Sequence, residues 1–439
     1  MASAAAAFGA RHLARGLGRM TQHIFQEGRG SHITTTDGTK LLDMTSGIGV
    51  VNLGHCHPAV TRAAQEQCGR ITHTQVNIGY GAAQLELIRE LLTIMPSPTL
   101  DTFFLWNSGA EAIEASVKIA RTHTSKPHII VMQGSYHGRT AATAAMTRSK
   151  TVYGERHGPL MPGVFATAFP YYSQFGLPAD TPTDELVEKS LYQLRLLLKQ
   201  QTAPSDTAAI VVESFLGEGG YVPVPKAFFE GLRAICDEHG ILLIADEVQS
   251  GFGRTGSMFA IEHANVVPDI LVAAKGVANG FPLSFVTSRK EIMDSCAPGS
   301  LGGTYAGNAV ACAAGSAVVR AFRDEKVLDN CNARSKQLFD GLTRIRTSSP
   351  AGALIEDIRG LGLMVGVQFK TPAGQPAISA ELAQACARRN MLILSTSLFD
   401  VIRWIPPLTV SEAELDEAIG IFSDALDEVA RARGAISST

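Results

Sequence analysis

The stretch ILLIADEVQSGFGRTG, residues 241–256, decides the fold. Its apolar residues 241–245 predict a buried strand that ends at Asp246, and a glycine-punctuated turn follows. A second apolar stretch, ILVAA at 270–274, predicts another strand that ends directly before Lys275. We therefore expect a carboxylate and an amine to lie together beyond the carboxyl ends of two strands, where ligands of such sheets gather.

This pair of side chains suits one cofactor, pyridoxal 5′-phosphate. Lys275, 29 residues after Asp246, would form a Schiff base with the pyridoxal aldehyde, and Asp246 would lie against the ring nitrogen. A carboxylate there keeps the nitrogen protonated, because an opposite charge within a few Å favours the charged form. Taken alone, each residue is more often an ordinary strand-end or surface charge, so the prediction rests on their combination.

The letters GFGRTG at 251–256 also fit the dinucleotide-binding fingerprint. That site needs a strand leading directly into its first glycine, a helix opening on its last, and an acid about 20 residues later. Here the residues DEVQS intervene at 246–250, and the acid Asp269 comes too early. The sequence therefore speaks against a dinucleotide site.

Composition narrows the class of protein. The 439-residue chain is long enough for two to three domains, and its net charge of −3 gives no reason to expect nucleic acid or an anionic membrane as a partner. No apolar run is long enough to predict a membrane span. Only 18% of residues are charged and 45% are hydrophobic, which indicates surface buried between subunits. The seven scattered cysteines fit reduced thiols inside a cell, and no metal site is predicted.

The N-terminus carries a possible targeting signal. Residues 1–26 contain no acid, and Arg11, Arg15 and Arg19 recur at helical spacing, as in a mitochondrial presequence. The alternative is an amphipathic arm of the folded protein. We expect a cytoplasmic location, with the mitochondrial matrix as the alternative.

Strand and helix patterns alternate between residues 100 and 290, which predicts an α/β fold with a mostly parallel sheet and helices on both of its faces. The predicted strands are 103–107, 128–132, 208–214, 241–246, 270–274 and 283–287. Proline- and tyrosine-rich loops are expected over 152–183.

The flanking segments predict a second, smaller α+β lobe. Residues 34–36 and 41–44 surround Asp37-Gly38, a good hairpin turn, and short strands and helices return after residue 320. We expect an N-terminal segment that joins the small domain, a large cofactor-binding domain and a C-terminal small domain. These three parts are 1–54, 55–320 and 321–439.

Polar groups follow four of the predicted strands, at the edge where ligands bind. Ser108-Gly109-Ala110 opens a helix, whose free N–H groups suit a phosphate, although a lone Ser-Gly is more often a plain helix cap. A tyrosine could stack on an aromatic cofactor, and an arginine could clamp a carboxylate. The groups that follow the other strands are Tyr136, His137, Arg139, Glu213 and Glu218.

Several stretches together resemble the class III aminotransferases, most closely the 4-aminobutyrate aminotransferases. The matching stretches are RGLG (15–18), GHCHPAV (54–60), NSGAEAIEASVKIAR (107–121), YHGRT (136–140), GEGG (217–220), CDEHGILLIADEVQSGFGRTG (236–256), AKG (274–276), PGSLGGTYAGN (298–308) and IRWIPPLT (402–409). The resemblance implies the aspartate-aminotransferase-like fold, fold type I of the pyridoxal-phosphate enzymes, in which a large domain is joined to a smaller one. One departure is Ser214, where relatives commonly have proline, and this affects the expected shape of the loop.

The resemblance also implies roles for single residues. Lys275 would carry the cofactor and then move the proton between substrate and cofactor. Asp246 would hold the ring nitrogen and Gln249 the ring oxygen, with Tyr136 and His137 by the ring face. Ser108, Gly109 and Ala110 would hold the phosphate, and Glu213 would lie among the cofactor-binding residues. Thr304 would reach the phosphate of a partner subunit's cofactor, so a homodimer, or a dimer of dimers, would share its active sites.

The implied reaction is a ping-pong transamination, most closely that of 4-aminobutyrate with 2-oxoglutarate, which gives succinate semialdehyde and glutamate. In similar proteins one arginine, here Arg139, serves the distal carboxylate of either ligand, and bidentate geometry suits this task. A second, here Arg403, pairs with Glu218 when the donor is bound and turns to the second carboxylate of glutamate. Ile48 is also expected in the substrate site.

Three alternatives stay open from the sequence. An acetylornithine, ornithine or broad ω-amine transaminase would use the same cofactor residues. A decarboxylating relative of the dialkylglycine type carries glutamine where Ile48 stands and tryptophan where Tyr136 stands, so both positions argue against it. A cofactor-binding module without turnover is disfavoured by the intact Lys275, Asp246, Gln249 and Thr304.

Overall fold

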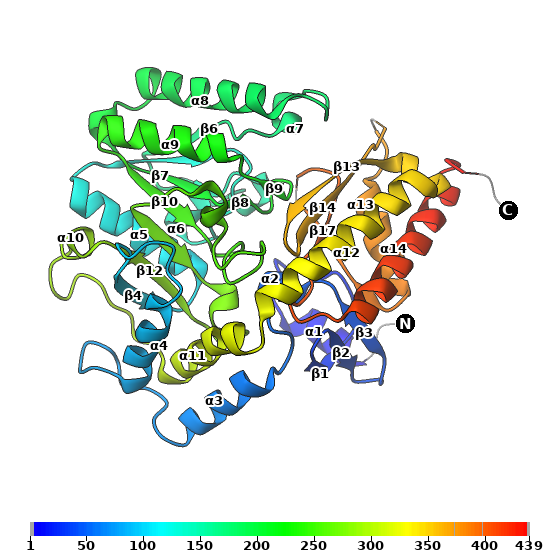
Figure 1. Cartoon of the computed structure of the whole chain (residues 1–439), viewed down its shortest axis with the longest axis horizontal. Helices are drawn as coiled ribbons and strands as arrows, with labels where there is room; N and C mark the ends of the chain where they lie inside the picture. The colour runs from blue at the N-terminus through cyan, green and yellow to red at the C-terminus, as the bar shows by residue number, and fades with distance from the viewer. Residues whose placement is uncertain (1–3, 373, 397, 437–439) are drawn as a thin grey trace.

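The structure, a computed structural model, describes residues 4–372, 374–396 and 398–436. Its centre is a seven-stranded sheet in the order β4-β12-β11-β10-β7-β5-β6 (Figure 1). These strands are β4 (Thr102–Trp106), β5 (His128–Met132), β6 (Val164–Thr167), β7 (Thr207–Glu213), β10 (Leu242–Asp246), β11 (Ile270–Ala273) and β12 (Ser284–Ser288). Only β12 runs antiparallel to its neighbours, so the prediction of a mostly parallel α/β sheet is confirmed.

Helices cover both faces of this sheet because successive strand residues point to opposite sides. On one face, side chains such as Ile244 and Val211 pack with the helix α5 (Gly109–Thr124). On the other, Leu243 and its neighbours pack in the core that includes α8 (Thr183–Gln200) and α9 (Lys226–His239). Burial on both faces explains why these strands are almost continuously apolar.

The region 152–183, predicted as loops, contains a strand and a short helix. β6 is only four residues long and pairs with β5 alone, at the edge of the sheet. Its sequence, VFAT, is too short to show a period of two, and α7 (Tyr172–Phe175) is a single turn. The prediction for this region is therefore wrong in part.

The C-terminal lobe is built on a second sheet in the order β13-β14-β17-β16. Its strands are β13 (Ile355–Leu361), β14 (Met364–Phe369), β16 (Leu394–Ser395) and β17 (Val401–Trp404), and its helices are α12 (Val327–Ser348), α13 (Ile378–Arg388) and α14 (Glu412–Ala432). Trp404 is fully buried there and its ring lies 5.3 Å from that of Phe422, so it is a core residue of this lobe.

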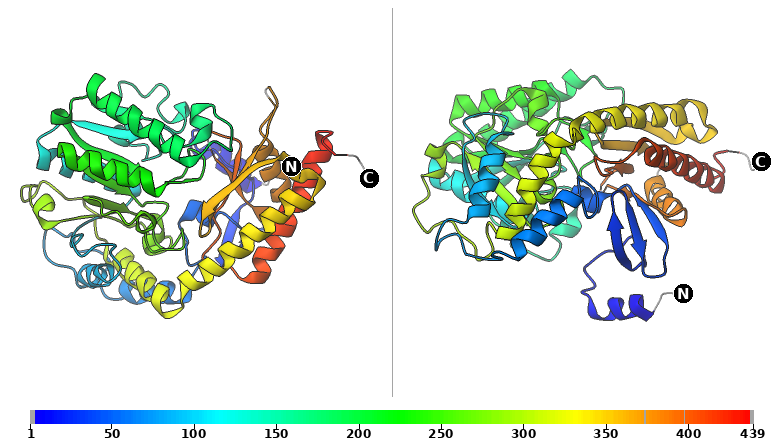
Figure 2. Two further views of the ribbon diagram at one scale, coloured as in Figure 1. Left: turned by 45° about the horizontal axis from the view of Figure 1, so that its top comes forward. Right: turned by 60° about the horizontal axis from the view of Figure 1, so that its bottom comes forward.

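The N-terminal strands form a third sheet, which lies beside the C-terminal lobe (Figures 1 and 2). Its order is β1-β2-β3-β15, with β1 (Phe25–Arg29), β2 (His32–Thr35), β3 (Lys40–Asp43) and β15 (Met391–Leu392). β2 and β3 pair antiparallel around Asp37-Gly38, as predicted for the hairpin. The remaining elements are α1 (Ala4–His12), α2 (Ser46–Gly49), α3 (Pro58–Cys68), α4 (Ala82–Leu92), α6 (Ala141–Met146), β8 (Phe215–Leu216), β9 (Val222–Pro223), α10 (Lys290–Met293), α11 (Ala309–Asp324) and five 3-10 turns.

The carboxyl ends of the parallel strands lie together at one edge of the large sheet. β4, β5, β7, β10 and β11 all point the same way, so their carboxyl ends share one edge. The C-terminal lobe lies next to that edge in Figure 1. Across the described ranges, none of the helices combines the length and the apolar character needed to cross a bilayer.

Candidate active site

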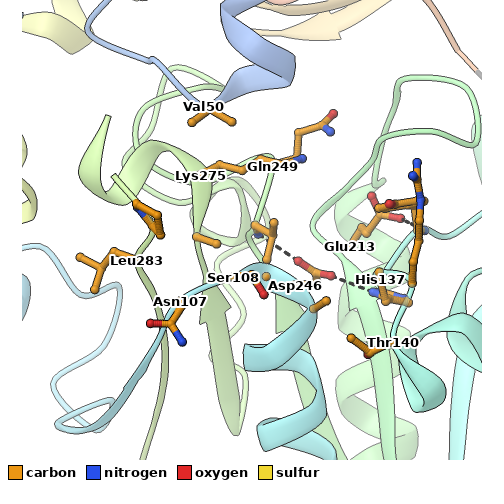
Figure 3. Close-up of a pocket in the computed structure, with 18 of the residues that line it drawn as sticks. Val50, Asn107, Ser108, His137, Thr140, Glu213, Asp246, Gln249, Lys275 and Leu283 are labelled. Atoms are coloured by element: carbon orange, nitrogen blue, oxygen red, sulfur yellow. Dashed lines mark hydrogen bonds and ion pairs between the residues drawn. The ribbon is translucent and has the colours of Figure 1, made fainter. Parts of the chain in front are cut away.

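A pocket of about 610 Å³ opens at this edge of the sheet (Figure 3). It brings together most of the residues singled out in the sequence, although they come from five different strand ends. These residues are Ser108, Gly109, Ala110, Tyr136, His137, Arg139, Glu213, Glu218, Asp246, Gln249 and Lys275.

Asp246 ends β10 at the base of this pocket and is 4% exposed. Its Oδ1 accepts a hydrogen bond from the Val248 amide at 2.9 Å, and its Oδ2 lies 2.7 Å from His137 Nδ1. His137, expected by the ring face, is therefore a hydrogen-bond partner of Asp246 (Figure 3). This contact fixes the direction of the Asp246 carboxylate.

Lys275 follows β11 and projects into the pocket. Its φ is +48°, a conformation that side-chain-bearing residues rarely adopt, and such strain concentrates at functional positions. Burial lowers the pKa of its ammonium group to about 8, partly offset by Glu218. A lysine with this pKa is a competent nucleophile and proton carrier near neutral pH.

The N-terminus of α5 faces the same pocket. Ser108 caps the helix: its Oγ accepts from the Glu111 amide at 3.3 Å, and Glu111 Oε2 accepts from the Ser108 amide at 2.8 Å. The amides of Gly109 and Ala110 lie in the first turn, where a helix offers them no acceptor. A Cβ on Gly109 would lie 2.8 Å from Val248 Cγ1, so only glycine fits there.

Gln249 carries an unsatisfied polar atom. Its Oε1 is buried and has no hydrogen-bond partner in the part of the chain that the structure describes. A buried carbonyl oxygen without a partner costs free energy, so this side chain suits a site that binds a polar ligand.

These groups fit pyridoxal phosphate. The helix start of Ser108, Gly109 and Ala110 offers N–H donors to an anion, and Asp246 offers a fixed carboxylate to a protonated ring nitrogen. Lys275 supplies the amine that an aldehyde requires, and the side-chain amide of Gln249 lines the same pocket and has an NH2 group that can donate to a ring oxygen.

Arg139 is an exposed cation held by aromatic rings. Its guanidinium carbon lies 5.7 Å from the centre of the Tyr136 ring and 4.8 Å from that of Tyr153, and the two rings meet edge-on. No ion pair links Arg139 to another described residue. Tyr153 was not predicted as a site residue, because it lies in a short 3-10 turn inside the region predicted as loops.

Arg403 differs from Arg139 in both burial and charge balance. It lies on β17, is 5% exposed, and forms an ion pair with Glu218. Burial opposes its charge most strongly, but Glu218, Tyr221 and Tyr153 together outweigh burial and raise the pKa of the guanidinium. These two residues are 185 positions apart in the sequence, and the resemblance to the family had implied that they pair.

Glu213 connects two loops of the site. Its Oε1 accepts from the Tyr136 amide at 2.7 Å and its Oε2 from the Gly217 amide at 2.9 Å. Burial raises the pKa of its carboxyl group to about 7. The next residue, Ser214, donates its amide to the Asp246 carbonyl at 3.2 Å, a bond that a proline would lack.

Three expected site residues do not line the pocket, and one of them, Arg403, reaches the site only through its ion pair with Glu218. Ile48 belongs to α2, where residues 46–49 all have positive φ, and it is 41% exposed while Val50 lines the pocket. Thr304 is exposed on the loop before α11, next to Tyr305. The described residues hold no group of three or more His, Cys, Asp or Glu side chains suited to a metal ion.

Comparisons with known proteins agree with this geometry. The sequence profile of the family described as aminotransferase class-III matches residues 14–426. The chain is 38% identical to the 5-aminovalerate aminotransferase of Pseudomonas aeruginosa over 95% of this chain and 96% of that one. It is 37% identical to the 4-aminobutyrate aminotransferase of Escherichia coli over 94% and 96%.

The fold is also found among solved structures. An (S)-enantioselective omega-transaminase from Thermomicrobium roseum superimposes with a TM-score of 0.88 at 29% identity, covering 97% of this chain and 98% of that one. The profile spans nearly the whole chain, and most of the residues predicted to bind the cofactor line one pocket. The chain belongs to the class III aminotransferases, which use pyridoxal 5′-phosphate.

Proposed function

We propose that the protein transfers the amino group of 4-aminobutyrate to 2-oxoglutarate, giving succinate semialdehyde and glutamate, the reaction of EC 2.6.1.19. The observation that carries this proposal is the contrast between two arginines in one site. Arg139 is an exposed cation without an ion-pair partner among the described residues, whereas Arg403 is buried and neutralised by Glu218. A ping-pong transaminase needs such a contrast, because its two substrates carry one and two carboxylates.

In this reaction the cofactor, Lys275 and Asp246 would each have a separate role. The bound cofactor supplies an electrophilic aldehyde and an electron-withdrawing ring. Lys275 Nζ, with its pKa near 8, would take the proton from the substrate carbon that bears the amino group and pass it on to the cofactor. Asp246, oriented by His137, would stabilise the protonated, positively charged form of the ring nitrogen.

The two arginines would select the substrates. With an ω-amino acid bound, Arg139 holds its single carboxylate, and the carboxylate of Glu218 balances the charge of Arg403. With 2-oxoglutarate or glutamate bound, Arg403 leaves Glu218 and meets the second carboxylate. The dicarboxylate is then held by two ionic contacts, whereas the monocarboxylate needs only the contact with Arg139.

A second candidate donor is 5-aminovalerate, which is one methylene longer. The relative named for that substrate and the one named for 4-aminobutyrate are equally similar to this chain, at 38% and 37% identity. One methylene in a pocket discriminates by only about 1–3 kcal/mol, so the two donors are compared directly in the experiments below. Acetylornithine, ornithine and other ω-amines complete that comparison.

We also propose a homodimer, alone or as a dimer of dimers, in which Thr304 of each chain completes the partner's site. Thr304 is exposed and does not line the pocket of its own chain, as this role requires. We propose a cytoplasmic location, because all seven cysteines are free thiols, as expected in a reducing compartment.

The Arg403→Ala variant tests the substrate assignment. It should raise the KM for 2-oxoglutarate by about 10-fold or more, since one charge-assisted contact is lost, and change the KM for pyruvate less than about 3-fold. Arg346→Ala, at an exposed arginine of α12, serves as the control. Equal losses for both acceptors would contradict the role of Arg403.

A further inference from the structure

The loop that carries Glu218, residues 217–221 and here called the gate loop, is held at both ends. At its start, the Gly217 amide donates to Glu213 Oε2 at 2.9 Å. At its end, the carbonyls of Gly220 and Tyr221 accept from one guanidinium, that of Arg359, with distances of 2.5 Å from Nη2 and 3.1 Å from Nε. The position of the gate loop therefore depends on a residue that none of the roles above uses.

Arg359 reaches the gate loop from β13 in the C-terminal lobe, and its side chain is 10% exposed. Asp357 Oδ2 balances its charge at 2.7 Å, and the Tyr171 hydroxyl accepts from Nη2 at 2.9 Å. The guanidinium also lies 4.9 Å from the centre of the Tyr171 ring. These contacts fix the guanidinium in one place, so it can fix the loop in turn.

The strand register places Arg359 in one row with Arg403, the arginine that pairs with Glu218. Arg359 on β13 is opposite Gly366 on β14, and Gly366 is opposite Arg403 on β17. Directly opposed residues of antiparallel strands project from the same face, so both arginines point from one face of this sheet. Arg359 grips the end of the gate loop and Arg403 pairs with Glu218 near its start.

Glycines let the gate loop lie directly on this row. A Cβ on Gly366 would lie 2.9 Å from Tyr221 Cβ, so Tyr221 lies directly against the middle of the row. A Cβ on Gly219 would lie 2.4 Å from the Gly134 carbonyl oxygen, and one on Gly220 2.9 Å from Tyr171 Cε1. The loop is therefore placed by the fully buried ring of Tyr221 at its end together with its backbone hydrogen bonds.

We infer that Arg359 is a positioning residue that holds Glu218 against Arg403 and so favours the monocarboxylate donor over the dicarboxylate. This inference rests on the substrate switch proposed above. Without Arg359 the gate loop loses two backbone contacts, the pairing of Glu218 with Arg403 weakens, and Arg403 presents its charge while the ω-amino acid is bound. The donor half-reaction then suffers, whereas the glutamate half-reaction, in which the pair is already open, does not.

The experiment compares two half-reactions of the purified holoenzyme in single turnover, each followed through the visible absorbance of the bound cofactor. For each donor, the measured quantity is the second-order rate constant of the half-reaction, and the two constants form a ratio of 4-aminobutyrate to glutamate. In Arg359→Met, the constant for 4-aminobutyrate should fall by about 10-fold, while that for glutamate should change less than about 3-fold. Arg359→Lys keeps the charge and some of the donors, and should give a smaller shift of the same sign. Arg346→Met, whose arginine donates to the Glu356 carbonyl on β13 and does not touch the gate loop, should leave the ratio unchanged.

A double-mutant cycle separates this inference from the switch on which it rests. Glu218→Ala should shift the ratio in the same direction, and adding Arg359→Met to it should cause no further shift. If Glu218→Ala leaves the ratio unchanged, the switch itself is wrong. Suppose instead that Glu218→Ala does shift the ratio. If Arg359→Met then lowers the rates of both half-reactions alike, or adds its full effect to that of Glu218→Ala, Arg359 has only a structural role. Should Arg359→Met not fold, an unchanged ratio in Arg359→Lys would overturn the inference.

Discussion

At the scale of single residues, the site keeps ionisable groups out of water, and this burial sets their chemistry. The pKa of Lys275 falls to about 8 and that of Glu213 rises to about 7, in both cases chiefly through burial. Asp246, 4% exposed, is held by His137 and the Val248 amide. The two carboxylates, Asp246 and Glu213, are thus held in fixed positions by hydrogen bonds, as expected of a preorganised site.

Replacing Lys275 by alanine should abolish turnover and leave cofactor binding in place. The helix start at Ser108 and the Asp246 carboxylate remain, whereas the proton carrier is lost, which costs at least about 10²–10⁴-fold in rate. Steady-state rates with 4-aminobutyrate, and the cofactor content of the purified protein, provide the measurement. Lys290→Ala, at an exposed lysine paired with Asp294, is the control. Substantial activity in Lys275→Ala would show that the wrong lysine was assigned.

Lys275 should also make the stability of the cofactor-free protein depend on pH. Its pKa in the folded state, about 8, is below the ordinary 10.5, so between these values the unfolded chain binds more protons. The free energy of unfolding therefore rises with pH in this window, by up to about 2–3 kcal/mol. Relative to the wild type, Lys275→Met should be more stable below pH 8 and lose that advantage toward pH 10.5 in urea unfolding. A constant difference across this range would contradict the assigned pKa.

Residue types and their positions at strand ends were enough to predict most of the pocket. Asp246 and Lys275 follow apolar strands, so their shared edge could be read from the sequence. The contact of His137 with Asp246 could not, because it joins residues 109 positions apart through the path of a loop. Tyr153 was missed for the same reason, since no periodic pattern marks the turn that brings it to Arg139.

At the scale of elements, the start of α5 and the end of β10 form one unit. Gly109→Ala should raise the dissociation constant of the cofactor about 10-fold, because the new methyl would lie 2.8 Å from Val248, whose amide orients Asp246. Titration of the cofactor-free protein measures this constant. Gly420→Ala, at an exposed glycine in the middle of α14 with open space around it, should instead stabilise the protein by about 0.5–1 kcal/mol. Unchanged affinity in Gly109→Ala would argue against this helix start as the phosphate site.

Long, strongly patterned elements were predictable and short ones were not. The strands β5, β7, β10 and β11 agree with their predicted ranges to within a residue or two, because each is an apolar run bounded by polar turns. β6 has four residues at a sheet edge, and α2 is a turn of four residues with positive φ. No propensity argument predicts that turn, since two of its residues, Ser46 and Ile48, do not favour left-handed backbone.

At the scale of the whole molecule, apolar side chains gather on one side near the loop of Thr304. Ile78 is 84% exposed, Tyr80 91% and Tyr305 66%, which is unusual for large apolar residues. We predict a dimer through this surface, and Ile78→Asp should shift the protein toward monomer and lower its activity together. Light scattering after gel filtration gives the mass. Tyr192→Asp, at a tyrosine that is 62% exposed on α8, at the top of Figure 1, is the control. An active monomer would contradict the shared site of Thr304.

The two-lobed arrangement itself followed from the order of patterns along the chain, because alternating strands and helices require a parallel sheet and the later short strands do not fit into it. What the sequence did not predict is how the lobes meet. The row of Arg359, Gly366 and Arg403 depends on the register of three strands, and only the structure shows it.

The central claim is tested most directly by the first half-reaction alone. The purified yellow protein is mixed with 4-aminobutyrate in the absence of any acceptor, and the absorbance of the cofactor is followed, with 5-aminovalerate, ornithine, acetylornithine, β-alanine and 2-methylalanine as parallel donors. We predict bleaching with 4-aminobutyrate that is reversed by adding 2-oxoglutarate. No response to 4-aminobutyrate together with bleaching by ornithine, or by 2-methylalanine with release of carbon dioxide, would contradict the proposed substrate.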